Sequence, residues 1–169
     1  MTRIGFGQND LAPYGNTGHW NDPDMMEVGN GGMTADEYKT HMSLWSILAA
    51  PLLAGNDVRN MTQATKDILL NREVIAVNQD KGGIQGKRVW QSGDQEIWVR
   101  GLAGSDKAVG VFNRGAAAAD VTVHWADIGI TKTVKSVRDL WEHKDVKTDG
   151  PEYKVTVPSH GVVFLRVGK

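Results

Sequence analysis

The sequence predicts two kinds of structure in succession, an α/β region followed by an all-β region. Apolar residues recur at helical spacing in the first part of the chain, whereas from residue 97 onward they alternate with a period of two. The pair Gly82-Gly83 stands where the period changes. We therefore expect a boundary at about Gly82, with βα units in residues 1–82 and an antiparallel β-sandwich in residues 83–169.

The strongest helix signal in the first region begins at Thr34. Thr34 and Glu37 have the spacing of a capping box, in which each side chain hydrogen-bonds a backbone N–H at the start of a helix. Apolar and aromatic residues then follow at helical spacing, namely Tyr38, His41, Met42, Trp45, Leu48 and Ala49. Pro51 ends the helix, which we expect to be largely buried.

Short strands are expected before the helical segments, near residues 20–28 and 51–56. The second of these is an apolar run bounded by turn residues, a pattern typical of a strand covered on both faces. A second amphipathic helix is expected at residues 61–69, with further helical turns at residues 74–77. Strand, helix, strand and helix in alternation indicate parallel βα units.

The second region shows five runs in which apolar residues alternate with neighbours that are mostly polar or point the other way. These runs are residues 97–99, 109–111, 121–125, 155–157 and 163–167. Turn residues such as Ser92-Gly93-Asp94 separate them at intervals of about ten residues. Short strands at this spacing are typical of an antiparallel sandwich or barrel.

Composition argues against several classes of function. The 169 residues include 19 basic and 20 acidic side chains, for a formal net charge of −1, and no long run of like charge. We therefore expect neither nucleic acid nor a membrane surface as a partner. The longest mostly apolar stretch, residues 44–54, is too short to span a bilayer. The absence of cysteine excludes disulfides, thiolate metal sites and a cysteine nucleophile.

Two aspartates flank a proline in the stretch "GHWNDPDMMEVGNGG", residues 18–32. On an extended backbone, Asp22 and Asp24 point to the same side, so they could act as a pair on one bond. Alternatively, Asn-Asp-Pro-Asp is simply a turn, since these residues favour turns. The cluster lies between a predicted strand and a predicted helix, where sites form in parallel α/β folds, and this position favours a functional role.

Other features of the first region point to few additional sites. Trp20 stands at the rim of the acidic cluster, where an aromatic ring commonly forms a platform for a sugar. Glycines 29, 31 and 32 are not followed by the residues of a phosphate loop, so we expect a flexible βα loop and no nucleotide cofactor. The five histidines lack the spacing of metal ligands, and His41 is expected to be a hydrogen-bonded core residue.

Three stretches of the chain resemble consecutive motifs of the α-galactosidases of glycoside hydrolase family 27. They are "GHWNDPDMMEVGNGGMT", "APLLAGNDVRNM" and "EVIAVNQD", and they occur in the family's order and at its separations. The resemblance covers residues 4–80, and the remainder is similar to the family's C-terminal β-domain more loosely. Departures are small: "GNTGHW" replaces the usual "GPGHW" or "GPGGW", and Met26 replaces a leucine.

The resemblance implies the last two βα units of a (β/α)₈ barrel followed by a β-sandwich. It also implies retaining hydrolysis of terminal α-linked galactose through a covalent glycosyl-enzyme, without a cofactor. The family's nucleophile and acid/base are aspartates that would lie upstream of Met1, so Asp22 and Asp24 are neither. Instead Asp24 would form a polar wall of the galactose pocket and Met25 would pack against the sugar, with Asp22 and Trp20 supporting them.

By this resemblance Met1 aligns with an interior position of a longer enzyme. We then expect apolar faces and backbone edges in residues 1–80 to be uncovered, and hence self-association, marginal order in residues 1–80 or dependence on a partner chain. The β-domain is expected to be the more stable half. Galactose, N-acetylgalactosamine and related pyranosides stay open as substrates, and a secreted, periplasmic or lysosomal location is what the family implies.

Two other functions compete with this hypothesis. The chain could be a non-catalytic carbohydrate-binding protein, in which Trp90 or Trp141 is an exposed platform on the β-domain. Burial of both tryptophans would remove the main support for that alternative. A purely structural β-domain, which covers the end of a barrel, is the third alternative.

Overall fold

The computed structural model describes residues 1–131, 133–148 and 150–168. Helices come first along the chain: α1 Thr2–Phe6, the 3₁₀ helix η1 Gly7–Tyr14, α2 Ala35–Ile47, α3 Gln63–Leu69 and α4 Arg72–Asn78. Strands follow: β1 Lys87–Ser92, β2 Gln95–Gly101, β3 Lys107–Asn113, β4 Ala119–His124, β5 Ser136–Asp139, β6 Lys144–Asp145, β7 Glu152–Val157 and β8 Val162–Gly168. None of the described helices is both long and apolar enough to cross a bilayer.

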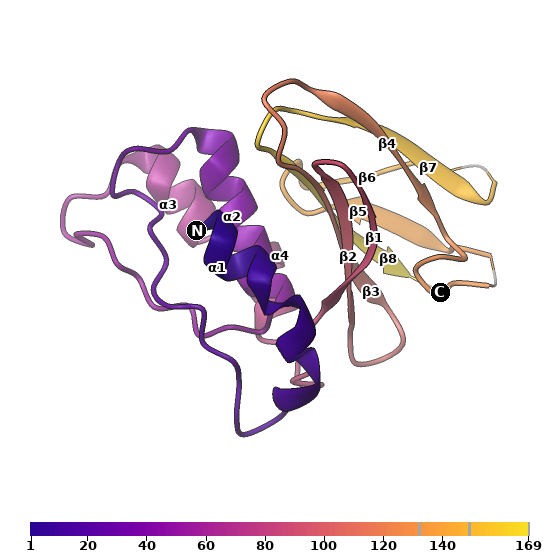
Figure 1. The fold of residues 1–169 in the computed structure, drawn as a ribbon, viewed down its shortest axis with the longest axis horizontal. Coiled ribbons are helices and arrows are strands. Elements are labelled where there is room, and N and C mark those ends of the chain that lie inside the picture. The colour runs from indigo at the N-terminus through magenta and orange to yellow at the C-terminus, as the bar shows by residue number, and fades with distance from the viewer. Residues whose placement is uncertain (132, 149, 169) are drawn as a thin grey trace.

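The strands form two antiparallel sheets, as predicted for the second region. The larger has the order β1-β2-β3-β8-β5-β6, and the smaller consists of β4 and β7. Figure 1 shows the helices between this sandwich on one side and two long connecting segments, residues 15–34 and 50–62, on the other. Sequence periodicity missed β1, β5 and β6, which are short or only partly buried.

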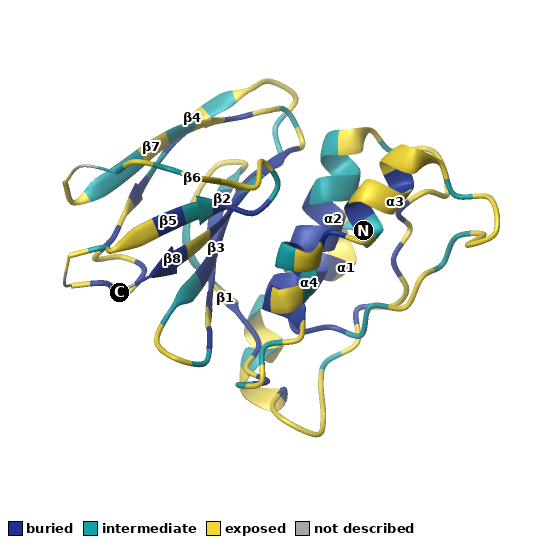
Figure 2. Cartoon of the chain, turned by 180° about the vertical axis from the view of Figure 1, so that it is seen from behind, coloured by how far each residue is buried: buried dark blue, intermediate teal, exposed yellow. Residues whose placement is uncertain are grey.

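The larger sheet is covered on both faces, which Figure 2 shows as dark blue central strands. Ile97, Val109 and Val111 pack against the smaller sheet in one core. The alternate positions of β2 and β3 point to the opposite face of the sheet, where they join a second core. In that core Trp98 and Phe112 pack with helical residues such as Trp45. Burial is therefore continuous along β2 and β3, since each face has its own apolar partner.

The capping box predicted at the start of α2 is confirmed. Thr34 Oγ1 accepts the Glu37 N–H at 3.2 Å, and Glu37 Oε2 accepts the Thr34 N–H at 2.7 Å. The bond from the Thr34 backbone lowers the pKa of the Glu37 carboxyl below its ordinary value, because it stabilises the charged form. Helix α2 ends at Ile47, ahead of Pro51.

The two strands expected near residues 20–28 and 51–56 are not formed, so the prediction overestimated the length of regular pairing between these segments. A single parallel bridge joins Met26 and Ala54 in their place. The Met26 N–H donates to Leu53 O at 2.8 Å and the Gly55 N–H donates to Met26 O at 3.0 Å. Two extended segments without further strands beside them do not sustain a regular parallel ladder.

An arginine of the β region ties it to the ends of two helices. The Arg100 side chain is 1% exposed, and its Nη1 donates to three backbone carbonyls at 2.7–3.1 Å. These carbonyls belong to Ser46 in α2 and to Val77 and Asn78 in α4. Burial lowers the pKa of Arg100 to about 10, so it is still charged at neutral pH. Helix C-termini favour such a cation.

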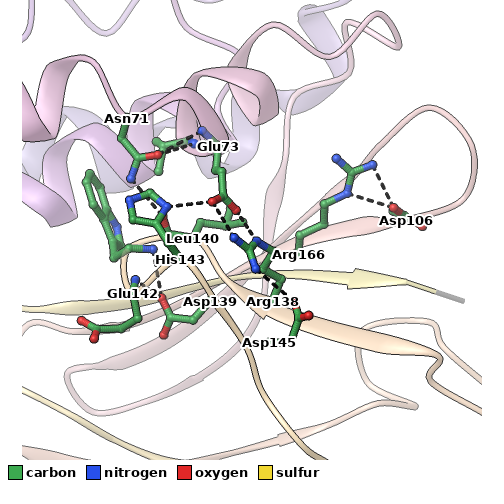
Figure 3. Close-up of polar contacts among 12 residues, drawn as sticks. Asn71, Glu73, Asp106, Arg138, Asp139, Leu140, Glu142, His143, Asp145 and Arg166 are labelled. Carbon is green, nitrogen blue, oxygen red and sulfur yellow. Dashed lines mark hydrogen bonds and ion pairs between the residues drawn. The ribbon is translucent and has the colours of Figure 1, made fainter.

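A second polar junction joins α4 to the turn after β5 (Figure 3). Glu73 accepts hydrogen bonds from Arg138 Nε at 2.6 Å and Nη2 at 2.9 Å, and His143 Nδ1 lies 2.7 Å from the same carboxylate. The bonds from Arg138 lower the pKa of Glu73. Asn71 Nδ2 also donates to Leu140 O at 2.9 Å. The boundary at about Gly82 stays a prediction, because the regions on either side of it share these contacts and a core.

Candidate functional site

The acidic cluster lies beside the parallel bridge and is held by its own side chains. Asp22 Oδ1 accepts the Asp24 N–H at 2.9 Å, and Asp24 Oδ1 accepts the Met25 N–H at 2.7 Å. Asp22, Asp24 and Met25 are all exposed, whereas Pro23 between the aspartates is buried. The structure thus brings three of the four predicted site residues together at the surface.

The backbone at Asp24 adopts a conformation that helix α2 helps to hold. Its φ of 77° lies in the left-handed region, which is uncommon for a residue other than glycine. Trp45, 1% exposed, donates from Nε1 to the Asp24 carbonyl at 2.9 Å. Such strain is of order 1–3 kcal/mol and persists where the surroundings determine it, so it marks Asp24 as a constrained position.

Side chains on the two connecting segments divide between two faces. Met26 and Val28, 3% and 0% exposed, belong to the core built with the helices. Met25 and Leu53, in contrast, are 48% and 51% exposed. Residues adjacent in an extended chain point to opposite sides, so Met25 and Leu53 point away from the helices. The sequence suggested burial on both faces for residues 51–56, and the exposure of Leu53 shows that this was wrong.

Trp20 is placed away from the aspartates. Its side chain, 48% exposed, lines a groove of about 540 Å³ with residues 49–51 and 78–81. Because the two segments run parallel, Trp20 and residues 49–51 both precede the bridge, whereas Asp24 and Met25 lie beside it. This position favours a supporting role for Trp20 over direct contact with a ligand at Asp24.

The two loops that follow the bridge, after Met26 and after Ala54, are joined by hydrogen bonds from polar side chains. Asn30 Nδ2 donates to Glu27 Oε2 at 2.6 Å and to the Gly55 carbonyl at 3.2 Å. The Gly31 N–H donates to Tyr38 Oη at 2.7 Å. The glycine-rich loop, predicted to be flexible, thus has fixed partners. Asn30 links the two βα loops, a role that its sequence position alone did not reveal.

An exposed aspartate in the second loop is held ionised by its neighbours. Asp57 accepts from Arg59 Nε at 2.9 Å and from Asn60 Nδ2 at 2.9 Å. These bonds, that from Arg59 foremost, lower the pKa of Asp57 to about 2. Asp57 therefore stays ionised at a pH at which an ordinary aspartate is already protonated.

His41 differs from its predicted role in one respect. It is a core residue, 1% exposed, with its ring 4.1 Å from that of Trp45. Neither ring nitrogen has a hydrogen-bond partner in the part of the chain that the structure describes, so the expectation of a hydrogen-bonded histidine is wrong. Burial lowers its pKa to about 4, which keeps the ring neutral. Within the described ranges, no group of three or more histidine and carboxylate side chains is arranged to hold a metal ion.

The two tryptophans of the carbohydrate-binding alternative are only partly exposed. Trp141 packs on the core shared with the helices, and its Nε1 donates to Ser43 Oγ at 2.9 Å. Trp90 packs against the core between the two sheets. Because both rings already serve internal contacts, their placement weakens this alternative.

Comparison with known proteins assigns both halves of the chain. A family model described as "Alpha galactosidase A" matches residues 2–80, and one described as "Alpha galactosidase C-terminal beta sandwich domain" matches residues 92–167. The chain belongs to the α-galactosidase family. It corresponds to the last two βα units of the family's barrel together with the β-sandwich that follows.

Individual relatives agree with this assignment. The chain is 47% identical to "Alpha-galactosidase 2" of Arabidopsis thaliana over 95% of its own length and 41% of the relative's. It is 46% identical to the α-galactosidase of Cyamopsis tetragonoloba, covering 39% of that protein. The crystal structure of α-galactosidase I from Mortierella vinacea superposes on 94% of this chain and 42% of its own, with a TM-score of 0.90 and 40% identity. The chain thus spans about two fifths of these relatives.

Proposed function

We propose that this chain forms one wall of the active-site cavity of an α-galactosidase, which hydrolyses terminal α-linked galactose with retention. The observation that carries the proposal is the exposed pair Asp24 and Met25, which directly precede Met26 of the parallel bridge. Ligand cavities of parallel α/β folds form at the carboxyl ends of the strands, and the loops that follow Met26 and Ala54 lie at that end of the bridge.

Each residue of the cluster has a proposed role. Asp24 offers carboxylate oxygens as acceptors for sugar hydroxyl groups, and the Met25 side chain covers an apolar patch of the ring. Asp22 fixes the Asp24 backbone through the bond to its N–H. Trp20 supports the start of the segment, several residues ahead of the bridge. The nucleophile and the general acid/base are assigned to polypeptide other than residues 1–169, as the family resemblance implies.

Galactose is the proposed sugar because the relatives of highest identity described above carry the name α-galactosidase. A family 27 β-L-arabinopyranosidase from Geobacillus stearothermophilus has the same fold, with a TM-score of 0.86, but is 26% identical. The β region is proposed to be structural, since its larger sheet shares a core with α2.

A chimaera tests this function. Residues 1–169 alone should not hydrolyse an aryl α-galactoside at a measurable rate. Fusion to the part of Arabidopsis α-galactosidase 2 that precedes the aligned region should give hydrolysis. In that chimaera, D24N should lower kcat/KM by about 100-fold, since a lost charged hydrogen bond is worth about 1.5–3 kcal/mol. The matched variant D67N, at an exposed aspartate of α3, should change it less than twofold. Turnover by residues 1–169 alone, or equal effects of the two variants, would refute the proposal.

A further inference from the structure

Glu27 is an exposed carboxylate next to the residues assigned to galactose. Exposure alternates along this part of the chain: Met25 and Glu27 are exposed. Met26 and Val28, 3% and 0% exposed, lie in the core. Because neighbours in an extended chain point to opposite sides, Glu27 lies on the same face as Met25. An extended chain rises about 3.3 Å per residue, so Glu27 stands about 7 Å beyond Met25, at the carboxyl end of the bridge.

Asn30 fixes the position of the Glu27 side chain. Its Nδ2 donates to Glu27 Oε2 at 2.6 Å and to the Gly55 carbonyl at 3.2 Å. The Asn30 N–H also donates to the Glu27 carbonyl at 3.2 Å, which closes a turn directly after the bridge. Among the described residues, Glu27 Oε1 bonds to no protein group. The carboxylate is therefore held in one place and has one acceptor oxygen to offer to a ligand.

The second connecting segment passes close to these side chains at Gly55. A Cβ added at Gly55 would lie 3.5 Å from Met25 Cβ and 3.7 Å from Asn30 Nδ2. It would also come within 2.8 Å of Met26 O, a distance that real Cβ atoms do not adopt, so only glycine fits here. Met25, Gly55 and the Asn30–Glu27 pair thus form one continuous surface, apolar at Met25 and acidic at Glu27.

We propose that Glu27 determines specificity for the leaving group, by accepting a hydrogen bond from a hydroxyl group of the sugar to which galactose is attached. The inference rests on the proposed function, which places galactose at Asp24 and Met25. A cavity that takes a terminal galactose encloses that ring, so the rest of the substrate extends toward the loops around the mouth. Those loops follow the carboxyl ends of the strands, where Glu27 lies. A carboxylate is a strong acceptor for hydroxyl groups, whereas a p-nitrophenyl leaving group has no hydroxyl group to donate.

Two substrates of the chimaera described above test this role: melibiose, in which galactose is α-linked to glucose, and p-nitrophenyl α-galactoside. E27Q keeps an acceptor for Asn30 but replaces the available oxygen with an amide group. It should lower kcat/KM for melibiose at least fivefold and for the aryl substrate less than twofold. E27A should lower the value for melibiose at least tenfold with the same selectivity. The matched control is E142Q, at an exposed glutamate of the β region, which should leave both values unchanged.

Two results would overturn the role of Glu27. Equal losses with both substrates would mean that it holds the loop or the galactose ring, and unchanged values for melibiose in both variants would mean that it contacts no leaving group. If D24N acts as expected while neither result for Glu27 does, the function stands and only this role fails. If the chimaera hydrolyses neither substrate, the function is refuted and this role with it. Should E27A alter the circular dichroism, E27Q decides, since it retains the bond to Asn30.

Discussion

Two leucines illustrate the difference between the two sides of the molecule. Leu165 of β8 is fully buried, whereas Leu53 on the connecting segment is 51% exposed. Both stand in apolar extended stretches that sequence alone predicts to be buried strands. The sheet around Leu165 has helices on one face and a second sheet on the other, while the segment around Leu53 has helices on one face only. Burial of an apolar strand is therefore decided by its tertiary partners rather than by its composition.

The largest expected effect compares these two sides directly. F112A removes a fully buried ring from the core between sheet and helices and should lower the free energy of unfolding by about 3–5 kcal/mol. L53A should change it by less than about 0.5 kcal/mol, as exposed substitutions usually do. Urea unfolding of both variants measures the difference. Similar losses would mean that the environments of Phe112 and Leu53 are not distinct.

A buried histidine makes stability depend on pH. The folded pKa of His41 is about 4, below the value near 6.5 expected in the unfolded chain. The unfolded state therefore binds the proton first, so stability is full above pH 6.5 and is lost as the pH falls to 4, by about 3 kcal/mol. H41F should remove this part of the pH dependence. An unchanged slope between pH 6.5 and 4 in H41F would contradict the assignment.

The junction at Arg100 should matter less than the core but more than a surface ion pair. R100M removes the guanidinium donor from three buried helix carbonyls and should cost about 2–3 kcal/mol. R166M removes an arginine that is paired with Asp106 at the surface and should cost less than about 1 kcal/mol. Thermal unfolding of the two variants compares them. If R166M were as destabilising as R100M, the junction would not be what joins the helices to the sheet.

The smallest effect concerns the start of α2. T34A removes the side-chain acceptor of the capping box and should cost about 1 kcal/mol, since an unpaired N–H is left at the helix start. T34S keeps the hydroxyl group and should change the free energy of unfolding by less than about 0.5 kcal/mol. Equal losses would show that the methyl group, not the hydrogen bond, stabilises this end.

Local signals were sufficient for some elements and insufficient for others. Thr34 and Glu37 predicted the start of α2 because a capping box involves residues only three apart. Trp45 was correctly predicted as a core residue from helical spacing. Strands near residues 20–28 were overpredicted, because a parallel strand depends on neighbours that no local pattern specifies. The strand β5 and the helices before residue 15 were missed, because the residues with which they pair or pack are remote in sequence.

In the candidate site, too, sequence predicted the arrangement of neighbouring residues but not that of residues further apart. Asp22, Asp24 and Met25 were predicted as a group and do lie together at the surface, because they are adjacent in sequence. Trp20 was predicted with them but lines a separate groove, since the intervening extended residues carry the chain several ångströms along its length. Their role in sugar binding stays a proposal.

Hydrogen exchange on the free chain tests the contrast between the two sides most directly. The amides of β3, which bond to strands on both sides, should exchange only through global unfolding. The amides of Met26 and Gly55, which hold the single parallel bridge, should exchange at least a hundredfold faster through local opening. Protection of those two amides equal to that of β3 would show that the connecting segments are as stable as the sandwich, and would contradict the contrast between the two sides of the molecule.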